Sequence, residues 1–325
     1  MDEIKTILIT GASGFVGQSL ALALQKEGAF NIRLATRNIH RLPSAFNDFE
    51  KVVVSNLSSE TQWSHALKDC TCVIHTAGRV HVSKKNDKDA ASEYFRVNVE
   101  GTLHLARQAV KAKVSRFIYF SSIKVNGEVS LNHSPFSADD RPSPMDAYSM
   151  SKYKAEEALK ELAIATGLEL VIIRPPLIYG PGVKGNFKIM LRWLHKGYPV
   201  LITKLENKRS FVSINNLSSL VALCIDHPAA VNQTFLVSDG VDLSTPELLN
   251  SIGDCLQKPA RLVYIPPLLL TLLLTVVKKR SVMDRLYGSL QVDIEKTRRL
   301  LDWTPQHDLK NMLKETVAAY IDQSS

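Results

Sequence analysis

The stretch TILITGASGFVGQSLALAL, residues 6–24, decides the fold. Its first five residues are apolar or β-branched, as in a buried strand, and its last eight are typical of a helix. Gly11, Gly14 and Gly17 lie between the two at three-residue spacing. Glycines permit a tight turn and let the backbone approach a pyrophosphate at the positive end of a helix. The stretch therefore predicts a dinucleotide-binding turn. A glycine-rich turn without a ligand is the alternative.

The alternation of strands and helices continues through the first half of the chain. Apolar strands separated by helices indicate a parallel sheet that is covered on both faces. We therefore predict a Rossmann-type doubly wound parallel sheet, an α/β fold, over residues 1–175. The runs RSFVSINNL and QTFLVSDG resemble sheet strands, so the chain is expected to return to this domain over about residues 210–240. A smaller α/β substrate domain is expected over residues 176–209 and 241–325.

Composition limits the classes of protein to consider. The chain has 325 residues, of which 45% are hydrophobic and 22% charged, and its formal net charge is +8. These values are typical of a globular protein, and a basic balance favours anionic ligands such as phosphates. Runs of like charge that would favour nucleic acid are absent from the sequence, so no nucleic-acid partner is expected. The four cysteines have no zinc-like spacing, which predicts no metal site and a reduced cytoplasmic protein.

Two apolar segments bear on location. The first strand begins almost at once, which leaves no room for a signal peptide. The stretch PPLLLTLLLTVVKKR, residues 266–280, has an uncharged run well short of the ~20 residues that a membrane-spanning helix needs. We expect a buried helix there. Weak contact with a membrane surface is the alternative, because basic residues follow directly.

The end of the second strand bears on the choice of cofactor. It reads LATRN, residues 34–38, and has no acid to accept hydrogen bonds from a free ribose 2′-hydroxyl. Arg37 could instead pair with a 2′-phosphate, which favours NADP(H) over NAD(H). A solvated arginine at a strand end is the alternative.

Two further motifs suggest acid–base chemistry. Tyr148 and Lys152 are four residues apart at the start of a helical run, so both can face one cleft. A nearby ammonium stabilises a phenolate and lowers the pKa of the phenol. The strand RFIYFSS places Ser121 and Ser122 at the carboxyl edge of the sheet, where ligands of such folds bind.

Together, the glycine loop, the serine-ended strand and Y-x-x-x-K resemble the extended short-chain dehydrogenase/reductases, the NAD(P)-dependent nucleotide-sugar epimerase/dehydratase family. The resemblance runs over nearly the whole chain. It implies that Tyr148 is the acid/base at the reacting oxygen. It also implies that Lys152 lowers the pKa of Tyr148 and holds the nicotinamide ribose. Ser122, placed by matching VNG (125–127) to the family's V-Y-G, would hydrogen-bond the same oxygen.

The resemblance also assigns binding residues. Asn56 and Leu57 stand where an Asp-hydrophobic pair usually contacts adenine, so that contact is expected to be altered. Asn98 matches an asparagine that we expect to be structural. The implied cofactor-binding residues are Gly11, Gly14, Phe15, Val16, Gly17, Arg37, Asn56, Leu57, Thr76, Ala77, Gly78, Tyr148, Lys152 and Pro175. The implied substrate-binding residues are Ser122, Asn186, Arg209 and Arg285. A homodimer through the Tyr148 helix and the run VEGTLHLARQAVKA is expected by the same likeness.

The expected reaction is hydride transfer at C4 of a UDP-linked sugar. Dehydratases of the family carry Asp-Glu where this chain has Ile123 and Lys124, and neither side chain can do the work of a carboxylate. We therefore expect reduction of a UDP-4-keto-6-deoxy-N-acetylhexosamine by NADPH, for surface polysaccharide. The alternatives are a UDP-sugar 4-epimerase with tightly bound NAD, a reductase of non-nucleotide ketones, and an NADP-binding redox sensor without turnover.

Overall fold

The computed structural model describes residues 4–80, 87–131, 134–203, 207–266 and 288–323. Arg285 and most of the apolar stretch 266–280 lie outside these ranges, so their expected roles stay predictions. Within the described ranges, no helix has the length and apolar character needed to cross a bilayer.

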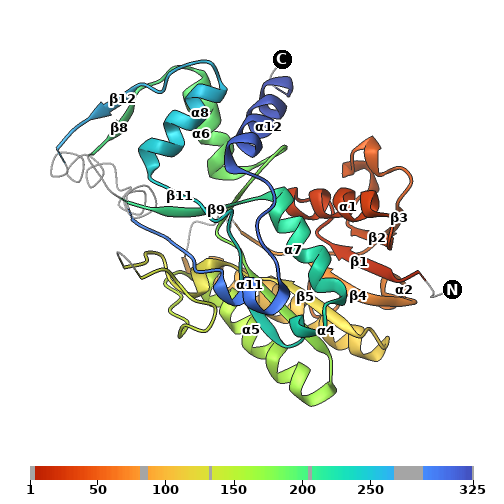
Figure 1. The fold of residues 1–325 in the computed structure, drawn as a ribbon. Coiled ribbons are helices and arrows are strands. Elements are labelled where there is room, and N and C mark those ends of the chain that lie inside the picture. The colour runs from red at the N-terminus through yellow and green to blue at the C-terminus, as the bar shows by residue number, and fades with distance from the viewer. Residues whose placement is uncertain (1–3, 81–86, 132–133, 204–206, 267–287, 324–325) are drawn as a thin grey trace.

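The large sheet decides the architecture (Figure 1). Seven strands lie in the order β10-β6-β5-β4-β1-β2-β3, and all neighbouring strands are parallel. The strands are β1 (Thr6–Thr10), β2 (Asn31–Thr36), β3 (Glu50–Val53), β4 (Cys70–His75), β5 (Arg116–Phe120), β6 (Glu169–Arg174) and β10 (Gln233–Leu236). The predicted Rossmann-type α/β fold is confirmed.

Helices cover both faces of this sheet (Figure 1). Along β1, Ile7 and Ile9 join a core cluster with α1 (Phe15–Glu27), α7 (Ile214–Asp226) and α11 (Glu295–Leu301). Leu8 faces the other way, because successive residues of a strand point to opposite faces. It joins a second cluster with α2 (Ser64–Leu67), α4 (Thr102–Lys111) and α5 (Ala147–Thr166). Two-sided burial explains why the strands are apolar without alternation.

Short helical segments connect these elements. They are α3 (Asp87–Tyr94), the π-helix η3 (Phe95–Gly101), and the 3-10 turns η1 (Ile39–Arg41), η2 (Ser44–Phe46), η4 (Ile123–Val125) and η5 (Pro228–Ala230).

The remaining elements pack beside the carboxyl edge of the large sheet. They are β7 (Leu177–Tyr179), β8 (Val200–Ile202), β9 (Arg209–Ser213), β11 (Asp242–Leu243), β12 (Leu262–Tyr264), α6 (Gly185–His195), α8 (Thr245–Cys255) and α12 (Leu309–Asp322). They form a sheet in the order β11-β9-β7, a pair β12-β8, and a third core cluster under α6, α8 and α12. The domain limits inferred from sequence stay a prediction.

One run differs from its expected structure. RSFVSINNL was expected to be a strand, yet only Arg209–Ser213 is extended, and it lies in the small sheet rather than in the large one. Ser213 caps α7, its side chain accepting a hydrogen bond from the backbone N–H of Asn216. A serine three residues before an asparagine amide is an ordinary helix start, and it ends the strand there.

Candidate active site

The turn after β1 contains three glycines, and of these only Gly14 is exposed to solvent. Gly11 has φ +74°, and a Cβ there would meet the Ala77 nitrogen at 2.7 Å. A Cβ on Gly17 would clash with the Gly11 carbonyl oxygen. Packing within the protein thus explains two of the three glycines.

Gly14 is different, because it is exposed. A Cβ on Gly14 would have one neighbour within 4 Å, the Gly11 oxygen at 3.1 Å, and otherwise open space. Gly14 also caps α1 with no side-chain hydrogen bond, so the first N–H groups of α1 face this space without a cap. A pyrophosphate fits such a cradle, because a helix N-terminus attracts anions. Phe15 and Val16 follow, half-buried against the core on the sheet.

Arg37 and Asn56, predicted to bind opposite parts of the adenosine end, contact each other. Both are exposed, and Arg37 Nη1 donates to Asn56 Oδ1 at 3.0 Å. Leu57 turns inward instead: a Cβ on Gly101 would lie 2.8 Å from its Cγ. The pair at the end of β2 and β3 is therefore polar and open to solvent.

The turn after β4 approaches the catalytic candidates. Thr76 Oγ1 donates to the Thr10 carbonyl at 2.7 Å, which ties this turn to β1. A Cβ on Gly78 would lie 3.4 Å from Lys152 Nζ. The buried Asn98, in the π-helix, accepts from the Arg79 N–H at 2.7 Å and donates to the Arg79 carbonyl and to Ser151 Oγ. These hydrogen bonds connect the turn to α5, which agrees with the structural role expected of Asn98.

Ser122 and Tyr148 are brought together at the carboxyl edge of the large sheet. Ser122 caps η4, its hydroxyl accepting from the Lys124 N–H at 3.3 Å, and this hydroxyl lies close enough to the Tyr148 phenol to lower the pKa of the phenol. Burial raises the pKa of Tyr148 to about 12; the Ser122 hydrogen bond opposes this rise, while Asp146 and Tyr94 add to it. Pro175 lies beside the pair, its carbonyl accepting from the Ile123 N–H at 3.1 Å.

Lys152, one helical turn after Tyr148, is buried under the site, and its expected effect on the pKa of Tyr148 stays a prediction. Its Nζ donates to the Phe120 carbonyl at 2.8 Å and lies 4.7 Å from the centre of the Tyr119 ring. Burial lowers the pKa of Lys152 to about 8, against the opposing effect of Glu156. The ammonium is thus anchored at the carboxyl end of β5.

Sequence analysis missed a buried network beneath the site. Glu156 is fully buried and receives two hydrogen bonds from Arg174, Nε at 2.9 Å and Nη2 at 2.6 Å. Ser121 Oγ donates to the same carboxylate, and Arg174 Nη1 donates to Asn126 Oδ1 at 3.0 Å. The four residues lie on different elements, so no local spacing could have revealed them.

Tyr94 is a second residue that was missed. Its ring meets the Tyr148 ring edge-on at 5.9 Å between centroids, and its hydroxyl donates to the Val80 carbonyl at 3.0 Å. It sits at the end of α3, directly before the π-helix, and no motif marks it. Tyr94 covers one side of the phenol that Ser122 contacts.

Two of the substrate candidates, Arg209 and Asn186, lie on β9 and α6. Arg209, at the start of β9, donates from Nη1 to the Gly288 carbonyl at 2.7 Å; burial lowers its pKa, and Glu128 opposes this. Asn186 is exposed in the first turn of α6. Next to it, Lys184 Nζ reaches the Ser13 carbonyl of the glycine turn at 3.5 Å. The structure thus brings the start of α6 near the cofactor turn.

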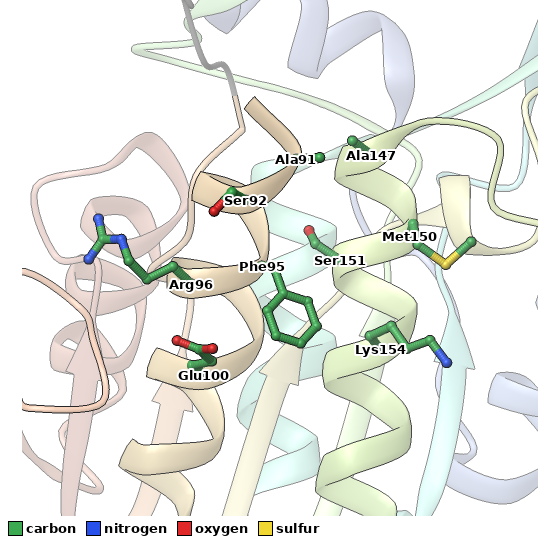
Figure 2. Close-up of a pocket in the computed structure, with 9 residues that line it drawn as sticks. All are labelled: Ala91, Ser92, Phe95, Arg96, Glu100, Ala147, Met150, Ser151 and Lys154. Carbon is green, nitrogen blue, oxygen red and sulfur yellow. The ribbon is translucent and has the colours of Figure 1, made fainter. Parts of the chain in front are cut away.

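A surface hollow lies away from these residues. A cavity of about 500 Å³ lies between α3 with η3 and the outer side of α5. Figure 2 shows Phe95 between the two helices, with Arg96 and Glu100 on one side and Met150 and Lys154 on the other. None of the predicted cofactor or substrate residues lines it. It borders the segments on which the homodimer prediction depends, and that prediction stays untested.

The fold and the Ser122–Tyr148–Lys152 arrangement beside a dinucleotide turn define a class of enzyme. The model of the NAD dependent epimerase/dehydratase family matches residues 7–238. The chain belongs to this family and is an NAD(P)-dependent nucleotide-sugar enzyme, which confirms the resemblance stated from sequence.

Three similar proteins are 4-epimerases. A UDP-glucose 4-epimerase of Vibrio cholerae is 40% identical over 324 residues, which covers 99% of this chain and 97% of that protein. An N-acetyl-α-D-glucosaminyl-diphospho-ditrans,octacis-undecaprenol 4-epimerase of Escherichia coli O157:H7 is 28% identical, covering 80% of this chain and 75% of that protein. The crystal structure of a UDP-glucuronic acid 4-epimerase of Bacillus cereus with NAD has a TM-score of 0.81 at 20% identity, over 98% and 100% of the two chains, and supports the fold alone.

Proposed function

We propose that the protein is a UDP-sugar 4-epimerase that keeps an NAD bound through turnover. The observation that carries the proposal is the approach of Ser122 to Tyr148 at the carboxyl edge of the sheet, in a chain 40% identical along its whole length to a UDP-glucose 4-epimerase. The sequence alone favoured reduction of a 4-ketosugar. The 4-epimerases among the relatives now favour the alternative.

The dinucleotide would be held by the residues already placed near the glycine turn. Gly14 and the first amides of α1 would take the pyrophosphate, Arg37 and Asn56 the adenosine end, and Lys152 with Gly78 the nicotinamide ribose. When bound, the nicotinamide would take a hydride from sugar C4 and return it to the other face.

Tyr148 would move the proton that accompanies each hydride transfer. As the phenolate, Tyr148 would accept the proton of the C4 hydroxyl as the ketone forms; as the phenol, it would give this proton back as the hydroxyl is restored. A pKa of about 12 keeps the phenol protonated at neutral pH, so the return step is favoured. The phenolate form must be stabilised before it can accept a proton. The Ser122 hydroxyl favours this form, because it lowers the pKa of Tyr148.

The UDP part would bind on the other side of the site. Arg209 is a cation that never loses its proton near neutral pH, so it suits a diphosphate. Asn186 in the first turn of α6 would donate to the same group. Both assignments are tested by the affinity for UDP of Arg209→Ala and Asn186→Ala.

A second candidate is reduction of a UDP-4-keto-6-deoxy-N-acetylhexosamine with NADPH. Arg37 favours it, because no acid stands at the end of β2 and the exposed guanidinium could meet a 2′-phosphate. The hydrogen bond from Arg37 to Asn56 leaves the other nitrogens of the guanidinium for such a contact.

One experiment separates the two candidates. The protein is purified without added nucleotide, denatured, and the released nucleotide identified by mass spectrometry. Native protein is then given UDP-glucose or UDP-N-acetylglucosamine, and separately NADPH with the 4-ketosugar. Stoichiometric NAD and interconversion of the C4 epimers support the epimerase. Empty protein that consumes NADPH with the ketosugar would establish the reductase.

Arg37→Glu tests the choice of cofactor directly. If Arg37 binds a 2′-phosphate, this change weakens NADPH binding at least tenfold and improves NAD binding. Equal dissociation constants for NADPH before and after the change would remove this role. Arg41→Glu, which changes an exposed arginine of the neighbouring 3-10 turn, is the matched control.

A further inference from the structure

Lys124 joins the two elements that carry the reacting hydroxyls. Its Nζ lies 2.8 Å from Asp146 Oδ2 and 2.5 Å from Glu128 Oε1. Its backbone N–H donates to Ser122 Oγ at 3.3 Å. The side chain of Lys124 is 23% exposed, so the pair is partly shielded from water. A single residue therefore contacts Ser122 through its backbone and the start of α5 through its ammonium.

Asp146 is the residue that starts α5. Its Oδ1 accepts from the Ser149 N–H at 2.7 Å, and Ser149 Oγ accepts from the Asp146 N–H at 3.0 Å. This capping box orients the first turn of the helix, and Tyr148 lies in that turn. The other carboxylate oxygen, Oδ2, is the one that meets Lys124. Asp146 thus holds the helix with one oxygen and Lys124 with the other.

We propose that Lys124 is a positioning residue for the proposed epimerase reaction: it ties the Ser122 turn to the first turn of α5 and neutralises the carboxylate that caps the helix of Tyr148. The proposal rests on the proposed function, since it assigns a role in that reaction. From its sequence position, Lys124 is only a residue that cannot replace a catalytic carboxylate. Its two ion pairs give it a role of its own.

The charges around Tyr148 come from several elements. On α5 they are Asp146 and Lys152, and the ammonium of Lys152 is bonded to the sheet. From α3, the Tyr94 ring faces the phenol, and the nearby Glu93 is paired with Arg79 and Arg96. Deeper on α5, Glu156 is paired with Arg174 of β6. From η4 comes Lys124, with Glu128 behind it.

The sign of the effect follows from these pairs. The negative charge of Asp146 raises the pKa of Tyr148, because it disfavours a second negative charge. Hydrogen bonds from Lys124 and Ser149 lower the pKa of Asp146 against its burial, so this carboxylate stays ionised. Removing Lys124 therefore leaves an uncompensated negative charge near the phenol. Removing the charge of Asp146 takes this negative charge away and should lower the pKa of Tyr148.

The test compares Lys124→Met with Asp146→Asn in the NAD-loaded protein. Asparagine caps a helix as well as aspartate does, so Asp146→Asn removes the charge and keeps the cap. If Tyr148 must lose its proton for oxidation, kcat rises with pH. We expect this rise to move to higher pH in Lys124→Met and to lower pH in Asp146→Asn. Each shift should be about half a pH unit or more, as for one partly screened charge nearby.

Opposite shifts are the signature that a merely structural ion pair would not produce, because both variants break the same contact. Lys124→Arg keeps the charge and should keep the wild-type profile. Lys160→Met, which removes a lysine from an exposed pair on the same helix, is the matched control and should also leave the profile unchanged. In the double variant Lys124→Met/Asp146→Asn the profile should return towards wild type.

Shifts in the same direction, or no shift in Asp146→Asn, would overturn the proposal. If Lys124→Met does not fold, Asp146→Asn, Lys124→Arg and the double variant still decide it. The Tyr148 phenol can also be titrated without substrate, from the tyrosinate absorbance of each variant minus that of the same variant carrying Tyr148→Phe. This measurement separates the inference from the proposed function: a wild-type protein without epimerase activity refutes the function, whereas unshifted phenol titrations refute the role of Lys124.

Discussion

Tyr148 is the residue on which the proposed proton transfer depends. Tyr148→Phe removes the hydroxyl and keeps the ring against Tyr94. We expect kcat to fall by about 10²–10⁴, the usual contribution of a general acid–base group, while the nucleotide released on denaturation is unchanged. Tyr153→Phe on the same helix, whose hydroxyl donates to Glu157 at 3.2 Å, should retain kcat. Undiminished turnover in Tyr148→Phe would remove this residue from the mechanism.

The burial of His75 predicts how the stability of the protein depends on pH. It is fully buried at the end of β4, between Thr10 Oγ1 at 2.7 Å and Thr102 Oγ1 at 2.9 Å. Burial, with a smaller effect of Lys152, lowers its pKa to about 3. Unfolded histidine titrates near 6.5, so between these values the unfolded state binds the extra proton. Stability from this residue is complete above about pH 6.5 and is lost as the pH falls towards 3.

Urea unfolding at several pH values measures this loss. We expect the free energy of unfolding to fall by up to about 1.4 kcal/mol per pH unit from this residue alone. His75→Gln should show a correspondingly weaker slope below pH 6.5. His40→Gln, which changes an exposed histidine, should keep the wild-type slope. Equal slopes for wild type and His75→Gln would contradict the prediction.

At the scale of the element, two glycines of the turn between β1 and α1 are needed for different reasons. Gly17 is required by packing within the protein, and Gly14 by the approach of the ligand. Gly17→Ala places a methyl group against the Gly11 carbonyl and should lower the unfolding free energy by about 1–3 kcal/mol. Gly14→Ala meets one close atom and faces open space. It should cost less stability and still weaken nucleotide binding about tenfold, or 1.4 kcal/mol. Thermal melts and titration with NAD compare the two; a larger loss of stability in Gly14→Ala would contradict this.

The parallel sheet covered by helices and the glycine turn of the site could be predicted from sequence, because these depend on local periodicity and on glycines at fixed spacing. Contacts between distant elements could not. The Lys152 ammonium is bonded to Phe120, 32 residues away, and this partner rather than the four-residue spacing decides where its charge lies. Likewise, Glu156 and Arg174 are 18 residues apart on a helix and a strand, and folding alone brings them together.

The RSFVSINNL run shows why a local prediction can be partly right. Its first residues, with Phe211 and Val212, favour a strand, and Arg209–Ser213 is one. The hydroxyl of Ser213 and the apolar run that follows favour a helix, and α7 then packs on the large sheet. The capping serine was the available signal for this boundary.

At the scale of the whole molecule, Arg116 fastens late parts of the chain to the centre of the large sheet. It is buried on β5 and donates from Nη1 to the carbonyls of Cys224, Ile225 and His227, at the end of α7. Its other side pairs with Glu169 at 2.7 Å. We expect Arg116→Lys, which loses the fork of donors, to lower the unfolding free energy by about 2–4 kcal/mol, because several carbonyls lose their donor.

Urea unfolding followed by two probes tests this prediction. Tryptophan fluorescence and circular dichroism should give one shared transition at a lower midpoint. Arg141→Lys, at an exposed position, is the control and should leave the midpoint in place. A midpoint for Arg116→Lys equal to that of wild type would show that the three carbonyls need no donor.

The place of β10 has a consequence for how the protein is made. This strand pairs with β6, yet it follows β6 in the chain by about sixty residues. During synthesis, β6 therefore leaves the ribosome before β10 and has one unpaired edge until β10 follows. Arg116 likewise leaves the ribosome before the three carbonyls to which it donates. An unpaired apolar edge invites association with other chains. Nascent chains stalled between β6 and β10 should be the ones that chaperones capture most strongly.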